Sequence, residues 1–194
     1  MQQTLRAQGY KVQDTLRHDV LGPVYDATLV NTDVALDILV VGLKNAASGR
    51  LCLYGPAGTG KTAFCHYLAN QLQKNLLTKT ASQLISKYLG ETEQNIAAAF
   101  AEAKENDAVL LLDEVDSFLQ DRRQAQQSWE VTAVNEMLVQ MEAFNGIFVA
   151  STNLIHNLDQ ASLRRFDLKA CFNFLKPQQA LALFNAYCLQ LKLA

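Results

Sequence analysis

The chain has 194 residues, with 17 lysines and arginines against 19 aspartates and glutamates, and its formal net charge is -2 at pH 7. Hydrophobic residues make up 49% and charged residues 19%, which excludes intrinsic disorder and allows the core of one domain. Because the basic residues are scattered among acids, no positive field predicts nucleic-acid binding.

No apolar stretch is long enough to span a bilayer, and the N-terminus lacks the pattern of a signal peptide. The four cysteines, Cys52, Cys65, Cys171 and Cys188, lie far apart without a Cys-x-x-Cys pair, which argues against zinc or redox chemistry. We therefore expect a cytoplasmic protein that does not contact membranes.

An amphipathic helix is predicted over Val34–Leu43, with Asn31-Thr32-Asp33 offering a hydroxyl or a carboxylate as its cap. Short apolar runs that alternate with segments of helical period predict an α/β fold, with a five-stranded parallel sheet and helices on both faces. The expected strands are Leu51–Tyr54, Leu76–Thr80, Ala108–Asp113, Ile147–Thr152 and Leu168–Phe174. The expected core faces of the helices between them are Phe64/Leu68/Leu72, Ile96/Phe100/Ala103 and Val134/Leu138/Met141.

A last helix is predicted from Pro177 through Ala180, Leu181 and Phe184, because proline suits a first helical turn. Little of the predicted domain is left for it to pack against. We divide the chain into an N-terminal linker and helix (1–46), a central α/β subdomain (47–175) and a C-terminal helical segment (176–194).

The strongest motif is Gly55-Pro56-Ala57-Gly58-Thr59-Gly60-Lys61-Thr62, which fits the Walker A pattern between a strand and a helix. Glycines let successive backbone N–H groups turn toward phosphate oxygens, and the following helix adds its positive N-terminal end. Lys61 supplies charge for the outer phosphates, and the Thr62 hydroxyl suits Mg²⁺. The expected nucleotide contacts are Gly55, Pro56, Ala57, Gly58, Thr59, Gly60, Lys61, Thr62, Ala63 and Asp113.

The run Val109-Leu110-Leu111-Leu112-Asp113-Glu114 is an apolar strand that ends in two carboxylates, the Walker B pattern. Neighbouring side chains at a strand end point in different directions and can take different tasks. Asp113 would hold the magnesium ion, together with Thr62. Glu114 would polarise the attacking water as general base.

Further motifs follow in order: Ser82–Glu93 with the core Lys87-Tyr88-Leu89-Gly90, Asn153 after a strand, and Leu163-Arg164-Arg165-Phe166-Asp167. With the two Walker motifs, they make the chain resemble the AAA+ ATPases, and within them the AAA protein-remodelling group, from about Arg50 to Phe174. The resemblance implies a P-loop NTPase αβα sandwich that binds ATP or ADP with Mg²⁺.

The resemblance also implies roles for individual residues. Asn153 matches the sensor 1 position, where an amide meets the lytic water or the terminal phosphate. Arg164 and Arg165 match arginine fingers that act on the nucleotide of a neighbouring subunit, although the family commonly spaces the two arginines two residues further apart. Lys87, Tyr88, Leu89 and Gly90 match a pore loop that grips an extended polypeptide. The stretch from Asp121 to Trp129 fits a second pore loop, a subunit contact or a solvated loop equally well.

From this likeness we expect an ATPase that forms a homo-oligomeric, hexameric ring and unfolds or remodels a polypeptide. Hydrolysis would require a neighbouring subunit. The alternative is a nucleotide-controlled assembly switch or loader with slow turnover. The resemblance implies that 47–175 is the large nucleotide-binding subdomain and 176–194 the start of a truncated helical lid. The rest of the lid and any sensor 2 arginine of the family are expected to lie outside this sequence.

Overall fold

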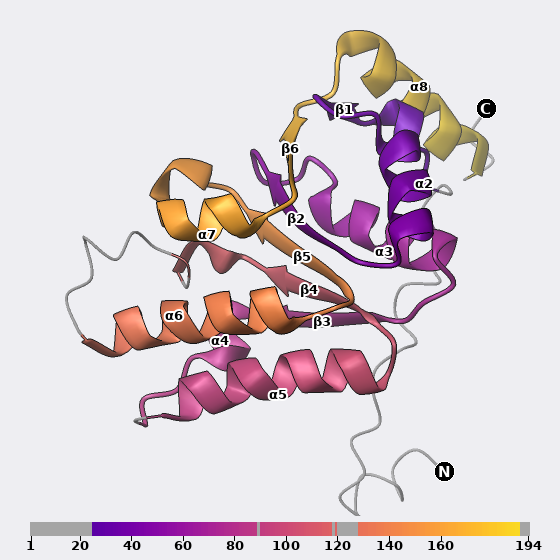
Figure 1. Cartoon of the computed structure of the whole chain (residues 1–194). Coiled ribbons are helices and arrows are strands. Elements are labelled where there is room, and N and C mark those ends of the chain that lie inside the picture. Colours follow the sequence, from indigo (N-terminus) through magenta and orange to yellow (C-terminus); the bar gives the residue numbers. More distant parts are fainter. Residues whose placement is uncertain (1–24, 89, 118, 120–127, 191–194) are drawn as a thin grey trace, which may run out of the picture.

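The computed structural model describes residues 25–88, 90–117, 119 and 128–190 (Figure 1). The five predicted strands are all present, and two of them have the predicted bounds. They are β2 (Gly49–Tyr54), β3 (Leu76–Thr80), β4 (Val109–Asp113), β5 (Ile147–Thr152) and β6 (Leu168–Asn173). In the sheet they follow the order β6-β2-β5-β4-β3 and all run parallel, which confirms the predicted fold class.

A sixth strand, β1 (Asn31–Thr32), extends the sheet by pairing antiparallel with β6. Its two polar residues carry no strand pattern, so the sequence did not predict it. Asn31 Nδ2 also donates to the Phe174 carbonyl at 2.7 Å. The segment that leads into helix α2 (Leu36–Ala46) therefore covers the β6 edge of the parallel sheet.

The predicted cap of that helix was wrong. Helix α2 (Leu36–Ala46) begins after Ala35, and no side chain caps it. Asp33 instead accepts the backbone N–H of Cys171 at 2.6 Å, and the Thr32 hydroxyl donates to the Val34 carbonyl at 2.7 Å. The segment Asn31-Thr32-Asp33 therefore bonds to β6, which is distant in sequence, and does not cap α2.

Alternate side chains of the central strands enter two separate cores. Leu51 and Leu53 pack with α2 and α3 (Lys61–Gln71), whereas Leu110 and Leu112 pack with the helices of the other face. That second face carries α4 (Ala81–Leu84), α5 (Glu91–Glu105), α6 (Ser128–Ala143) and α7 (Gln160–Arg165). The helices therefore sandwich the sheet (Figure 1), and the predicted core faces of α3, α5 and α6 are confirmed as buried or partly buried.

Helix α8 (Pro177–Gln190) begins at the predicted proline and contacts the short 3-10 helix η1 (Ala27–Leu29). The Gln179 side-chain amide donates to the carbonyls of Thr28 and Val30. No residue of α8 is buried. The division of the chain at 46/47 and 175/176 stays a prediction. Among the described residues, no helix has both the length and the apolar character needed to cross a membrane.

Three neighbouring strands, β2, β5 and β4, end at the same edge of the sheet. Residues 55–62, Asn153 and Glu114 follow those ends directly. In open parallel sheets, the carboxyl ends of the strands are where ligands bind. The strand order therefore brings together motifs that lie about a hundred residues apart in sequence.

Candidate active site

The loop between β2 and α3 turns sharply at Gly55, whose φ is 135°. A Cβ at this position would lie 1.9 Å from the Phe172 carbonyl oxygen of β6, so only glycine lets the loop pass. The loop ends at Gly60, which precedes α3 in a left-handed conformation, and no side chain caps the helix. The N–H groups of the first turn of α3 are therefore available to an anion.

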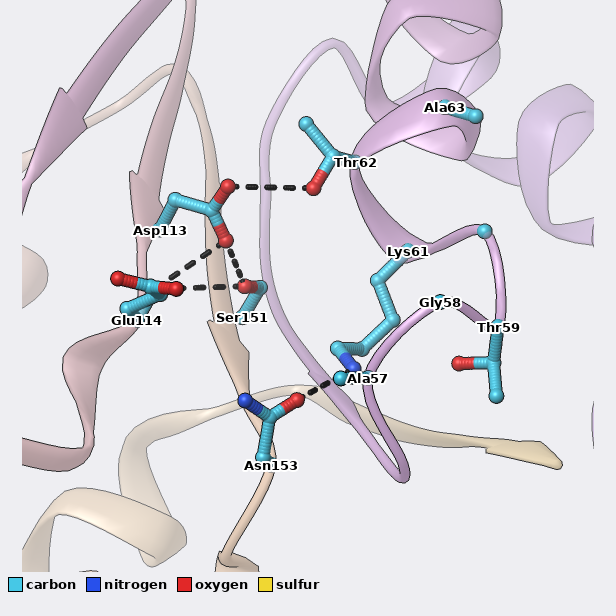
Figure 2. A pocket seen from close by; sticks show the side chains of 11 residues that line it. Ala57, Gly58, Thr59, Lys61, Thr62, Ala63, Asp113, Glu114, Ser151 and Asn153 are labelled. Carbon is cyan, nitrogen blue, oxygen red and sulfur yellow. Dashed lines mark hydrogen bonds between the residues drawn. The ribbon is translucent and has the colours of Figure 1, made fainter.

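The Lys61 ammonium is held inside this loop. Its Nζ donates to the carbonyls of Gly55 (2.7 Å) and Pro56 (2.9 Å) and to Asn153 Oδ1 (2.8 Å). Burial lowers the pKa of Lys61, while the nearby Asp113 and Asp116 charges oppose that shift. One cation thus joins the glycine-rich loop to the end of β5 (Figure 2).

The Thr62 hydroxyl and the Asp113 carboxylate face each other, with 3.1 Å between Oγ1 and Oδ2. The other oxygen of Asp113 accepts the Ser151 hydroxyl and the Glu114 backbone N–H. A hydroxyl and a carboxylate are hard oxygen ligands, and Mg²⁺ takes one or two such protein groups and keeps several waters. The residues present therefore fit Mg²⁺, and we found no larger metal-binding cluster in the described parts of the chain.

Glu114 follows β4 with φ 59°, a left-handed conformation that costs a non-glycine residue about 1–2 kcal/mol. Such strain persists where the surrounding structure enforces it, often at functional sites. Here the turn directs the Glu114 side chain to the pocket, away from the Thr62–Asp113 pair (Figure 2). No described residue hydrogen-bonds to the Glu114 carboxylate, so its oxygens are available to accept a hydrogen bond from a bound molecule.

Asp116, on the 3-10 helix η2 (Val115–Ser117), was missed by the sequence analysis as a site residue. Its carboxylate accepts the buried Thr152 hydroxyl and the backbone N–H groups of Asn153 (3.2 Å) and Leu154 (3.1 Å). It thereby fixes the end of β5 from which Asn153 reaches Lys61. Asp116 could have been found as a third acid two residues after the Walker B pair. Nothing in the sequence indicates Ser151, because it reaches Asp113 only through the pairing of β4 with β5.

The assembled residues line an open pocket of about 360 Å³. Its walls are Ala57, Gly58, Thr59, Gly60, Lys61, Thr62, Ala63, Asp113, Glu114, Ser151 and Asn153. Gly55 and Pro56 are not among its walls, but their carbonyls accept hydrogen bonds from Lys61.

The other predicted site residues lie elsewhere. Arg164 and Arg165 are on α7, and Lys87, Tyr88 and Gly90 are in the segment before α5; none of them lines the pocket. Leu89 lies outside the described residues, and so do residues 121–127 of the stretch from Asp121 to Trp129, whose last two residues begin α6. The three readings of that stretch stay predictions.

A lysine-bearing glycine loop and a hydroxyl–carboxylate pair, at the carboxyl edge of a parallel sheet, define a P-loop nucleotide-binding protein. Within that class, residues 51–174 match the model of the ATPase family associated with various cellular activities (AAA). The chain belongs to this family, as the motif resemblance predicted.

Among known proteins, the chain is similar to the spastins of Drosophila erecta and Drosophila melanogaster, at 35% identity over 136 residues. The match covers 66% of this chain and 18% of each relative. Drosophila persimilis spastin is also 35% identical, over 17% of its length. The chain therefore spans less than a fifth of the relatives that it matches.

Replacing Asp116 with alanine should destabilise the protein, because the hydroxyl of Thr152 would lose its acceptor. Thr152 is only 1% exposed, so water cannot easily take the place of that acceptor. We expect the free energy of unfolding to fall by about 1–3 kcal/mol, the cost of an unsatisfied buried donor. Urea denaturation measures the change. Glu105→Ala, an exposed acid of α5, is the control and should alter stability by less than about 0.5 kcal/mol. Equal unfolding midpoints for both variants would contradict the assignment.

Proposed function

We propose that this chain is the ATP-hydrolysing module of a ring-forming protein that pulls on or remodels polypeptides. The observation that carries the proposal is the convergence of Lys61, Glu114, Asn153 and the Thr62–Asp113 pair on one pocket. Family membership supports ATPase activity in general. The individual roles, the ring and the polypeptide substrate are our proposals.

In this proposal the N–H groups at the start of α3 bind phosphate oxygens, and Lys61 transfers its hydrogen bonds from loop carbonyls to the outer phosphates. Thr62 and Asp113 would hold Mg²⁺, which would neutralise phosphate charge. Glu114 accepts a proton from the water that attacks the terminal phosphorus, as ATP and water become ADP and phosphate. The Asn153 amide, released by Lys61, can then hydrogen-bond that water or the terminal phosphate.

The two arginines of α7 have different surroundings. Arg165 donates to Glu142 of α6 at 2.6 Å and to the Ala161 carbonyl at 3.0 Å. Arg164 is exposed, and no described residue pairs with it. We therefore assign the role of arginine finger, which acts on the nucleotide of a neighbouring subunit, to Arg164, because its guanidinium is exposed and bonds to no other described residue. Arg165 holds α7 against α6.

The candidate pore loop displays an aromatic side chain to solvent. Tyr88 is 60% exposed, and the Lys87 ammonium lies 5.2 Å from the centre of its ring. A large exposed aromatic can pack against many different side chains, which suits a grip on polypeptide with little demand on sequence. This exposure favours polypeptide remodelling over a switch that would have no use for the loop.

Glu114→Gln in the assembled full-length protein should abolish turnover while nucleotide binding persists, because the amide retains the shape of the side chain but cannot accept the proton. We expect phosphate release to fall by about a hundredfold or more, with little change in the affinity for a fluorescent ATP analogue. Glu105→Gln, on the outside of α5, serves as the matched control. Unchanged steady-state turnover in Glu114→Gln would refute the assigned base.

Arg164→Ala should lower turnover by about a thousandfold, whereas Arg165→Ala should act mainly by loosening α7. Both variants are measured by phosphate release and by thermal unfolding, where Arg165→Ala is expected to show the larger loss of stability.

Mixing subunits tests whether Arg164 acts across an interface. Arg164→Ala subunits keep an intact pocket, and Lys61→Ala subunits keep the arginine. Mixed rings should regain activity that neither variant has alone. If mixing restores nothing while each variant still assembles with wild-type subunits, Arg164 does not act in trans.

Tyr88→Ala should abolish processing of a disordered polypeptide such as α-casein and leave basal ATP hydrolysis unchanged. Tyr88→Phe keeps the ring and should retain processing. The readouts are casein-stimulated phosphate release and the basal rate in the absence of casein. Indifference of both rates to Tyr88→Ala would favour the nucleotide-controlled assembly switch instead.

A further inference from the structure

The segment that carries Tyr88 is fastened to the first turns of α5. The Thr92 hydroxyl accepts the Ser86 N–H at 3.0 Å and donates to the Ser86 carbonyl at 3.4 Å. Asn95 Nδ2 donates to the Leu84 carbonyl at 3.0 Å. Thr92 is only 4% exposed, so these contacts form a buried base on which the segment rests.

A second, outer set of contacts centres on the Ser86 hydroxyl. It donates to Glu91 Oε2 at 2.5 Å and accepts the backbone N–H of Tyr88 at 3.2 Å. A serine hydroxyl has a single proton to donate. Because that proton is donated in a hydrogen bond to Glu91, the lone pairs of the hydroxyl are available to accept the Tyr88 N–H. The Glu91 backbone N–H donates to the Tyr88 carbonyl at 3.4 Å, so the N–H and the C=O of Tyr88 are both hydrogen-bonded.

The Tyr88 ring itself has little to hold it in place. Its described ring contact is the Lys87 ammonium, which is also exposed. The place from which the ring extends is therefore set by the backbone at Tyr88, and that backbone is held by Ser86 and Glu91. Gly90, in a left-handed conformation at the start of α5, adds no side-chain contact of its own.

We propose that Ser86 and Glu91 are positioning residues for polypeptide binding, which hold Tyr88 in the orientation that grips the chain. This inference rests on the proposed function of Tyr88. A backbone segment that is ordered before binding loses less conformational entropy when its ligand arrives. Ser86 and Glu91 thus act on the affinity for polypeptide and leave ATP hydrolysis itself alone.

Ser86 and Glu91 suit a test better than Thr92. Glu91 is exposed and Ser86 is half-buried, so their replacement removes the outer contacts while the buried base remains. Each has a conservative variant that restores the same bond: threonine keeps a hydroxyl at position 86, and glutamine keeps an accepting oxygen at position 91.

Amide hydrogen exchange on this chain tests the geometry without any substrate. Ser86→Ala removes the acceptor of the Tyr88 N–H, and we expect the Tyr88 amide to exchange about fivefold faster, the effect of losing one ordinary hydrogen bond. Ser86→Thr should exchange like the wild type. An unchanged Tyr88 exchange rate in Ser86→Ala would overturn the proposal, whatever Tyr88 does in function.

Substrate-stimulated hydrolysis in the full-length assembly tests the consequence, with α-casein as the probe. Ser86→Ala and Glu91→Ala should each raise the half-maximal casein concentration about three- to tenfold, with the basal rate and the maximal stimulated rate unchanged. Ser86→Thr and Glu91→Gln should restore the wild-type value. A change in basal rate, or failure of the conservative variants to restore affinity, would indicate a general structural role and overturn the proposal.

Tyr88→Ala measured in parallel separates the two levels of inference. If Tyr88→Ala abolishes stimulation while Ser86→Ala and Glu91→Ala bind casein normally, the positioning role is wrong and the gripping role stands. If Tyr88→Ala itself leaves stimulation unchanged, the proposed function of the loop fails, and the positioning role for polypeptide fails with it. Thermal unfolding of every variant verifies that the fold is intact; should Ser86→Ala not fold, the Glu91→Ala and Glu91→Gln pair decides.

Discussion

The site is organised around the buried ammonium of Lys61. A charge removed from water must be surrounded by protein oxygens, and three segments supply them or their charge. The loop carbonyls of Gly55 and Pro56 and the Asn153 oxygen, just after β5, accept hydrogen bonds from this ammonium. The negative charges of Asp113, at the end of β4, and Asp116 stabilise it further. These groups meet at Lys61 because β2, β5 and β4 are neighbours that end at the same edge of the sheet. The strand order therefore determines how the charge of Lys61 is stabilised.

The three acids at the end of β4 and just after it, Asp113, Glu114 and Asp116, make different contacts. Asp113 faces Thr62 and Ser151, Glu114 turns away through a strained backbone, and Asp116 binds the end of β5. The contacts continue outward, because α6, which leads into β5, donates from Thr132 to Glu93 of α5 at 2.5 Å. Helix α5 in turn fastens the Tyr88 segment. A contiguous set of packed elements and hydrogen bonds therefore connects the pocket with the loop.

Features encoded locally were predictable from the sequence, and features that depend on distant contacts were not. The five strands and the Walker motifs follow from short runs of residue types, and two strands have the predicted bounds. The strand β1 and the lost cap at Asp33 depend on β6, whose partner residues lie 138 or more positions away. Ser151 meets Asp113 across paired strands, 38 residues apart. Sequence pattern alone also cannot distinguish Arg164 from Arg165, because the difference is the position of Glu142 on another helix.

That difference bears on where hydrolysis is controlled. The pocket contains the Lys61 ammonium, the Thr62–Asp113 pair and the Glu114 carboxylate, all from this chain, and our proposal assigns them to the phosphates, Mg²⁺ and the attacking water. Arg164 is not among its walls and projects from α7, which follows the end of β5. An arginine that neutralises charge in the transition state contributes about a thousandfold or more to phosphoryl transfer. If that group comes from a neighbour, binding requires one subunit and fast hydrolysis requires two, so assembly itself becomes the condition for turnover.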